Sequence, residues 1–220
     1  RFDRTVVPVK DQNGITLLDR DETIRPGTTV EGLSGLKPAF AMIGDQGGFD
    51  AVAQTKYPQL ERINHLHHAG NSSGIVDGAA LLAIGSEQAG KDFDLTPRAR
   101  VVESTSAGLA PEIMGLGPVP ATEKALERSG WSVADLGAVE LNEAFATQSL
   151  ASMRRLGLDP ETVNADGGAI ALGHPLGSSG SRLVVTLLGR MEREGADRGL
   201  ATMCVGVGQG EAAIIERVEA

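Results

Sequence analysis

The chain has few aromatic residues and almost no cysteine. Phe, Tyr and Trp make up 3% of its 220 residues, and Cys204 is the one cysteine. A single cysteine excludes an internal disulfide framework and fits a reducing compartment better than a secreted setting. The sequence also lacks any apolar run as long as a transmembrane helix, and its start shows no secretory hydrophobic region. We therefore expect a cytoplasmic protein without a membrane partner.

Positive charge is in the minority. Lys and Arg number 20 against 29 Asp and Glu, which leaves a formal net charge of −9 at pH 7. This balance argues against non-specific nucleic-acid binding, although a few local groups can still hold an anionic ligand. The chain also starts with Arg1 instead of Met, so we expect a fragment or a chain cleaved from a longer precursor.

Glycine, in contrast, is abundant at 29 residues, which suits tight turns between strands and helices. From residue 98 onward, the hydrophobic periodicity alternates between strand and helix. The predicted order is strand 100–102, helix 121–129, strand 138–141, helix 144–156, strand 163–172, helix 183–194, and strands 200–205 and 212–215. Strands separated by helices predict a parallel sheet, and the final hairpin adds an antiparallel member. The fold class is therefore α/β, a βαβαβαββ mixed sheet with helices on its faces.

The first part of the chain is polar and rich in turns. The expected elements there are strand-like pieces at residues 5–9 and 15–18, an irregular region up to residue 62, and a helix over residues 75–84. His65, His67 and His68 crowd together, but no further His or Cys lies nearby in sequence to complete a metal site. We therefore expect no bound metal.

Three loops leave the carboxyl ends of predicted strands, where ligands bind in open α/β sheets. They carry Asn142, His174 and Cys204. An amide, an imidazole and a thiol would then meet at one end of the sheet, which suits thiol or carbonyl chemistry. Each residue also has a simpler structural interpretation: a helix N-cap, part of a glycine-rich turn, and an inert buried thiol, respectively.

His174 follows a short apolar stretch and comes before the start of a helix. Backbone N–H groups and the positive end of the helix dipole disfavour an imidazolium at such a place. A neutral imidazole can act as a base near pH 7. His174 is therefore the candidate base.

Four motifs together resemble the thiolase family. They are Ala-Gly-Asn-Ser-Ser-Gly at residues 69–74, Asn-Glu-Ala-Phe at 142–145, Gly-Gly-Ala-Ile-Ala-Leu-Gly-His-Pro-Leu-Gly-Ser-Ser-Gly at 167–180, and Cys-x-Gly-x-Gly-x-Gly at 204–210. The motifs fall in family order, and the resemblance covers essentially the whole chain. It implies an acyltransferase that cleaves 3-oxoacyl-CoA or condenses acetyl-CoA. Coenzyme A thioesters would be its partners, coenzyme A its co-substrate, and no cofactor would be tightly bound.

The resemblance also implies a role for each site residue. His174 would activate a nucleophilic cysteine, and Cys204 would be the thiol that moves a proton to or from the substrate. Asn142 would position a water that forms one oxyanion hole together with His174. The Gly206 N–H would contribute to a second hole, and each hole would stabilise negative charge as it develops.

A groove for coenzyme A is implied as well. Ser73 would touch the pantetheine, Phe40 and Ala69 would line the groove, and Arg25 would meet a phosphate. Phe145 is assigned to the same groove.

The chain departs from the family pattern in several places. The nucleophilic cysteine and about the first half of a thiolase are missing, so this chain alone is not expected to acylate. Val207 stands where many members have glycine, which indicates an altered turn. His68 replaces a small residue, and residues 44–64 look longer than in the shorter bacterial members. These differences indicate a substrate other than acetoacetyl-CoA.

By this resemblance, the chain has three parts. Residues 1–62 would be the end of a loop (lid) domain, 63–97 the last part of the N-terminal half, and 98–220 the C-terminal half. A homodimer or homotetramer is implied, together with the missing N-terminal half. The alternative is a non-catalytic thiolase-like protein that binds acyl-CoA or lipid. A β-ketoacyl synthase fits less well, because enzymes of that type use a second histidine where Cys204 stands.

Overall fold

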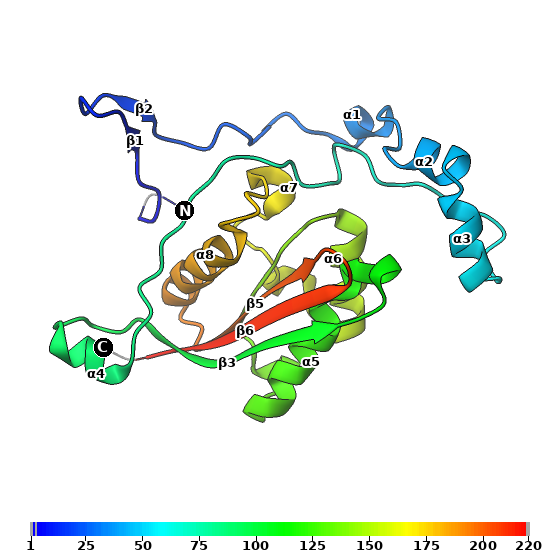
Figure 1. The fold of residues 1–220 in the computed structure, drawn as a ribbon. Helices are drawn as coiled ribbons and strands as arrows, with labels where there is room; N and C mark the ends of the chain where they lie inside the picture. The colour runs from blue at the N-terminus through cyan, green and yellow to red at the C-terminus, as the bar shows by residue number, and fades with distance from the viewer. Residues whose placement is uncertain (1, 3, 219–220) are drawn as a thin grey trace.

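The computed structural model describes residue 2 and residues 4–218, which form two parts (Figure 1). The first part is a long excursion with short elements. It contains β1 (Val9–Lys10), β2 (Thr16–Leu18), α1 (Val30–Ser34), α2 (Ala41–Gln46), α3 (Phe49–Lys56) and α4 (Glu87–Asp92). The second part is a sheet covered by helices. It contains β3 (Ala99–Gly108), η1 (Pro111–Leu116), α5 (Pro118–Ser129), η2 (Val133–Asp135), β4 (Ala138–Leu141), α6 (Ala146–Leu156), η3 (Pro160–Thr162), α7 (Ala169–Leu172), α8 (Ser179–Glu194), β5 (Arg198–Val205) and β6 (Gln209–Arg217).

The sheet has the strand order β3-β6-β5-β4. β4 and β5 run parallel, with Leu141 opposite Thr202, and β6 is antiparallel to both β5 and β3. The parallel pair is joined through α6, α7 and α8, whereas β5 and β6 form a hairpin. This mixed sheet with helices on its faces confirms the predicted fold class.

Helices cover both faces of the sheet (Figure 1). On one face, α5 and α6 bury Val139, Leu200 and Ile214. On the other face, Leu187 and other apolar side chains of α8 pack on Ala201. Because successive side chains of a strand point to opposite faces, Leu200 and Ala201 fall into different clusters. The two clusters form the core.

Glycine ends each of the three long helices. Gly130, Gly157 and Gly195 follow α5, α6 and α8 with φ of 71°, 68° and 71°. Glycine adopts this left-handed conformation at little cost, and its N–H then bonds to a carbonyl of the last turn. The predicted ends of all three helices are confirmed. α5 begins earlier than predicted, at Pro118, whose fixed φ suits the first position of a helix.

The helix expected over residues 75–84 is wrong. The segment forms neither helix nor strand, and Leu81 is 91% exposed, with Ile75 and Ile84 exposed as well. Leu82 packs against the cluster around α8. Because most helix stability comes from burying one apolar face, a segment whose apolar side chains stay exposed gains little from coiling.

The strand expected over residues 163–172 is also wrong. Val163 makes a single parallel bridge with Val139, after which the chain turns away into α7. Asn164 and Gly167 have φ of 49° and 103°, which breaks an extended chain. The Asn164 side chain then takes the place of a strand: it accepts the N–H of Leu141 at 2.9 Å and donates to the Leu141 carbonyl at 2.8 Å.

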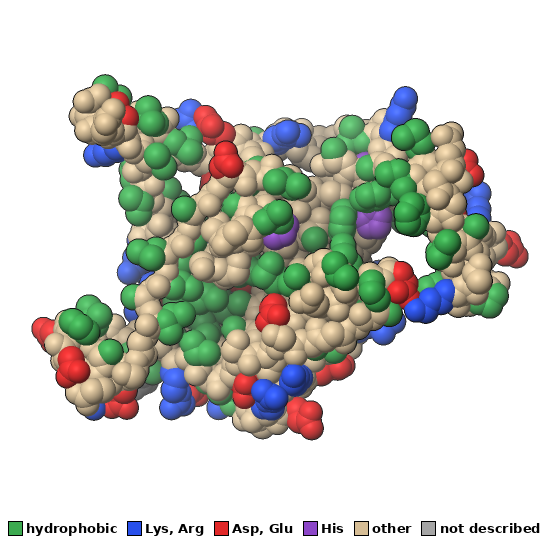
Figure 2. All heavy atoms as spheres, in the orientation of Figure 1, with side chains coloured by type: hydrophobic (Ala, Val, Ile, Leu, Met, Phe, Trp, Pro, Cys, Tyr) green, Lys and Arg blue, Asp and Glu red, His purple; other side chains and the backbone are tan. Residues whose placement is uncertain are grey.

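The excursion is less regular than the sheet. The strand-like pieces expected at residues 5–9 and 15–18 are strands only in part, because β1 begins at Val9 and pairs with β2 as an antiparallel ribbon. The helices α1, α2 and α3 arise inside the region expected to be irregular, and Gly44 is their one buried residue among those described. Figure 2 shows apolar side chains spread over the surface of this part. None of the helices in the described part of the chain has the length and apolar content needed to cross a membrane.

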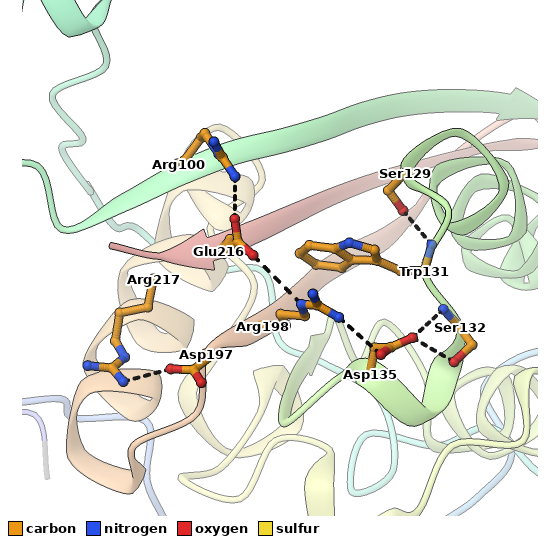
Figure 3. A network of polar contacts seen from close by, with 9 residues as sticks. All are labelled: Arg100, Ser129, Trp131, Ser132, Asp135, Asp197, Arg198, Glu216 and Arg217. Atoms are coloured by element: carbon orange, nitrogen blue, oxygen red, sulfur yellow. Dashed lines mark hydrogen bonds and ion pairs between the residues drawn. The ribbon is translucent and has the colours of Figure 1, made fainter. Parts of the chain in front are cut away.

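A network of ion pairs lies at the start of β5 (Figure 3). Arg198 pairs with Asp135 at 3.0 Å and with Glu216 at 3.7 Å, and its guanidinium stacks over the Trp131 ring at 4.4 Å. Glu216 also pairs with Arg100. Surface pairs of this kind each contribute little stability, but together they tie β3, β5, β6 and η2 at the end of the sheet opposite Asn142.

Candidate active site

Asn142 follows the last residue of β4 and is fully buried. Its backbone N–H donates to the Thr202 carbonyl of β5 at 2.9 Å, which extends the parallel pairing by one residue. Its side-chain Nδ2 lies 3.4 Å from Nε2 of His174. The structure thus brings two of the three residues that the sequence singled out into contact at one end of the sheet.

His174 lies between α7 and α8 and is held on several sides. Gly173 before it has φ of 91°, where a side chain would be strained and would also collide with Val76. The His174 N–H donates to the Gly74 carbonyl at 2.8 Å, and its Nδ1 lies 2.6 Å from the Ser179 hydroxyl oxygen. The imidazole therefore has one fixed orientation at the first turn of α8.

The partner of Nδ1 sets the tautomer. The hydroxyl of Ser179, which is fully buried, donates to the Pro175 carbonyl at 3.0 Å. Its oxygen is then the acceptor for a proton on Nδ1, which leaves the lone pair on Nε2 facing the Asn142 amide. Burial, followed by the charge of Arg182, lowers the pKa of His174, so the ring is kept neutral. A neutral imidazole with a free Nε2 is suited to accept a proton.

Sequence reasoning did not find Ser179. It falls in the Gly-Ser-Ser-Gly stretch before the helix predicted over residues 183–194, whereas α8 already begins at Ser179. The spacing could have indicated this contact. A serine that follows the histidine by five residues and lies in the first turn of the next helix can place its hydroxyl against the imidazole ring.

Cys204 lies near the end of β5, two residues beyond Thr202, and is 7% exposed. By strand alternation its side chain falls on the α5 face together with Leu200 and Thr202, whereas Asn142 faces α8. Within the described residues no hydrogen bond joins its sulfur to His174. Burial raises the pKa of Cys204, which keeps the thiol protonated near neutral pH.

Gly206 opens the turn between β5 and β6. A Cβ added there would meet no atom within 4 Å, so the space beside it is open. The next residue, Val207, has φ of 66° and is exposed. The turn therefore uses the left-handed conformation that favours glycine, although valine occupies the position.

Several residues assigned to the coenzyme A groove lie near the Asn142 loop. The Phe40 and Phe145 rings stand edge to face with centroids 6.1 Å apart, and Ser73 donates its N–H to the Ala144 carbonyl at 3.0 Å. Ala69 is exposed on the turn before Ser73. Arg25 is also exposed, on the segment before α1, and no contact within the described residues joins it to this group.

His67 joins this group, which the sequence did not predict. Its ring is 4.7 Å from the Phe145 centroid and 5.9 Å from that of Phe40, and its Nε2 lies 2.6 Å from the Thr147 hydroxyl. Burial lowers the pKa of His67, and the charges of the neighbouring histidines lower it further. We name Phe40, His67 and Phe145 the aromatic cluster.

The other two histidines of the same stretch turn elsewhere. His65 Nε2 lies 2.9 Å from Asp50, and His68 Nδ1 accepts the Gly70 N–H at 3.1 Å. Across residue 2 and residues 4–218, no group of three or more His, Cys, Asp or Glu side chains is arranged to hold a metal ion.

Comparison with known proteins identifies the family to which these features belong. Residues 95–217 match the family model described as thiolase, C-terminal domain. The chain is 50% identical to a 3-ketoacyl-CoA thiolase of Photobacterium profundum, over 99% of this chain and 53% of the relative. It is also 50% identical to a beta-ketoadipyl-CoA thiolase of Pseudomonas putida, over 99% and 50% of the two chains. The chain thus spans about half the length of the curated relatives it matches.

Solved structures agree. The Bacillus anthracis acetyl-CoA acetyltransferase is 40% identical with a TM-score of 0.83, over 99% of this chain and 50% of that one. Human mitochondrial 3-ketoacyl-CoA thiolase in complex with CoA is 38% identical with a TM-score of 0.75, over 92% and 46% of the two chains.

Proposed function

The chain belongs to the thiolase family, and we propose that it supplies the base, the second thiol and both oxyanion holes of a CoA-dependent acyltransferase. The reaction would be the cleavage of a 3-oxoacyl-CoA to acyl-CoA and acetyl-CoA, or the reverse condensation. The nucleophilic cysteine would come from sequence outside these 220 residues, because the one cysteine here lies in a different motif. The oligomeric state and the cytoplasmic location stay predictions.

One observation supports the proposal most strongly: the His174 ring is fixed between Asn142 and Ser179. In the proposed reaction, Nε2 takes the proton of the nucleophilic cysteine and so generates the thiolate that attacks the acyl group. The lowered pKa of His174 favours this step, because the ring must be neutral to accept a proton.

Asn142 would help to stabilise negative charge on the substrate oxygen. Its Oδ1 is buried and has no hydrogen-bond partner among the described residues, so it can accept a bond from a water placed beside His174. A donor positioned where negative charge develops lowers the barrier more than it stabilises the bound substrate.

Cys204 would move the second proton. Its raised pKa keeps the proton on sulfur, ready for transfer to the substrate carbon in cleavage. The open space beside Gly206 would let the thioester carbonyl approach the N–H of this turn. Because the thiol and the imidazole come from opposite faces of the sheet, the substrate would lie across the strand ends between them.

The coenzyme A groove would run past the Asn142 loop. The aromatic cluster and Ser73 lie beside that loop and offer apolar surface with a few polar atoms, which suits a pantetheine arm. Ala69 would line the same groove. Arg25 would reach a phosphate of coenzyme A only if the segment before α1 moved against this groove.

A non-catalytic protein that binds acyl-CoA is the second candidate. It is favoured by the absence of a nucleophilic cysteine from these 220 residues. The two candidates differ in one measurable property, since only the enzyme forms a covalent acyl intermediate.

The test uses the longer protein that contains the preceding half. We expect intact-mass spectrometry after exposure to acetyl-CoA to show one added acetyl group, and His174→Ala to slow its appearance by roughly 10²- to 10⁴-fold, the usual contribution of a general base. Cys204→Ala would still acylate but would lose 3-oxoacyl-CoA cleavage. Glu123→Gln, an exposed change on α5, serves as the control. A protein that binds acyl-CoA without acylating supports the second candidate, and a normal acylation rate in His174→Ala refutes the assigned base.

A further inference from the structure

A buried glutamate and arginine lie between β4 and α8, the two elements that also hold the proposed base. Glu140 of β4 is fully buried, and its Oε2 is 3.6 Å from Nη1 of Arg182 on α8. The Arg182 side chain is 19% exposed. At this separation the carboxyl and the guanidinium lie side by side without a direct hydrogen bond.

Two sets of side-chain contacts connect β4 with α8: one contains Glu140 and Arg182, and the other contains the proposed base. Glu140 precedes Asn142 by two residues, so both side chains leave β4 on the same face. Arg182 follows Ser179 by three residues, so both lie on one side of α8 a turn apart. One link is Asn142–His174–Ser179, and the other is Glu140–Arg182.

Buried side-chain atoms that lack a hydrogen-bond partner gather at this place. Five buried side-chain atoms in the described residues have no hydrogen-bond partner, and all belong to Glu140, Asn142 or Arg182. A buried group without a partner costs free energy, so a cluster of them in one spot is best explained by function. A hydrophobic pair of similar volume would hold β4 and α8 together at lower cost.

Charged groups of both signs surround Glu140. Glu140 is faced by Arg182 and Arg190 of α8, by Asp166 and by Glu143. Burial raises the pKa of Glu140 to about 8 against the opposing effect of the arginines, so the carboxyl is largely neutral at pH 7.

Arg182 therefore keeps its positive charge while its nearest acidic partner is neutral. Burial lowers the pKa of Arg182, and the charges of Glu140, Glu143 and Asp21 raise it. An arginine stays charged under such conditions. The charge acts on His174, because the His174 ring contacts Ser179 one turn before Arg182 on α8.

We propose that Arg182 is a positioning residue for the base: its buried guanidinium, whose nearest acidic neighbour Glu140 is neutral, repels a proton on His174 and so keeps the imidazole ready to accept one. This inference rests on the proposed function for the meaning of the base, but the electrostatic coupling exists whether or not the protein is an acyltransferase. Arg182 does not touch the reacting atoms, and it acts through His174.

The coupling is measured on the protein itself by long-range proton–nitrogen NMR spectra of the four histidine rings as a function of pH. Arg182→Met removes the charge while keeping an unbranched side chain, and Arg182→Lys keeps the charge. We expect the His174 titration to move to higher pH in Arg182→Met and to stay near that of the unmodified protein in Arg182→Lys. The rings of His65, His67 and His68 serve as internal controls and should not move.

A second variant keeps the test decisive if Arg182→Met does not fold. Glu140→Gln preserves the shape of the neutral carboxyl. In the unmodified protein, ionisation of Glu140 near pH 8 should add a second inflection to the His174 signal, and this inflection should vanish in Glu140→Gln. A His174 titration unmoved in folded Arg182→Met, or an identical pair of curves for Glu140→Gln and the unmodified protein, overturns the proposal.

Activity gives a separate readout in the longer protein. If it acylates, the acid limb of the pH profile of acylation should move to higher pH in Arg182→Met, with little change in KM. If it does not acylate, the proposed function fails, but the NMR result still decides whether Arg182 controls the protonation of His174.

Discussion

Glu140→Gln should change how the stability of this protein depends on pH. The carboxyl is fully buried in β4, and its pKa is raised from an ordinary 4.5 to about 8, chiefly by desolvation. Between these two values the folded state holds a proton that the unfolded state releases. Unfolding therefore releases a proton in this window, and raising the pH favours unfolding.

The size of the effect follows from the two pKa values. Each pH unit between them is worth about 1.4 kcal/mol, so the folded protein should lose roughly 3 to 6 kcal/mol from this group between pH 4.5 and 8. The contribution is fully present below pH 4.5 and is lost as the pH rises through about 8. Gln cannot ionise, so the variant should escape this loss.

The assay is urea unfolding of the unmodified protein and of Glu140→Gln at several pH values from 5 to 9. The two should unfold at similar urea concentrations at pH 5, and the variant should be the more stable by several kcal/mol at pH 8.5. Glu123→Gln on the exposed face of α5 controls for the loss of a carboxyl as such. A constant difference between Glu140→Gln and the unmodified protein at every pH would refute the reasoning, because it would show that Glu140 ionises alike in both states.

Three further predictions concern the turn, the base and the core. Val207 holds a β-branched side chain at φ of 66°, so Val207→Gly should raise the free energy of unfolding by about 1 kcal/mol in a urea titration, and a destabilised variant would contradict this. Ser179 is the Nδ1 partner of His174, so Ser179→Ala should slow acylation of the longer protein by roughly 10-fold or more with little change in KM, and an unchanged rate would show that the ring is oriented by other contacts. Leu187 is fully buried under the sheet, so Leu187→Ala should cost about 2 to 5 kcal/mol in urea unfolding, whereas Leu150→Ala at a 48% exposed position should cost far less, and equal losses would refute the core assignment.

The sequence by itself determined the features that depend on local chemistry. Glycine after α5, α6 and α8 fixes where each helix ends, because the left-handed backbone is open to glycine and strained for other residues. The alternation of strand and helix periods from residue 98 onward gave the mixed sheet and its covering helices, apart from the strand expected over residues 163–172. Asn142 was placed correctly at the carboxyl end of β4, whereas His174 comes within 3.4 Å of it from the turn after α7 and not from the strand expected there.

Tertiary structure decided the rest, because the deciding contacts join residues far apart in the chain. Residues 163–172 have the composition of a strand, but the Asn164 side chain occupies the edge of β4 that a strand would need. Residues 75–84 have the apolar content of a helix, but little in the described chain covers their side chains. The sequence shows Glu140 only as one acidic residue in an apolar strand. Its neutral state depends on burial, which outweighs the opposing charge of Arg182, and desolvation is a property of the folded environment that no local pattern encodes.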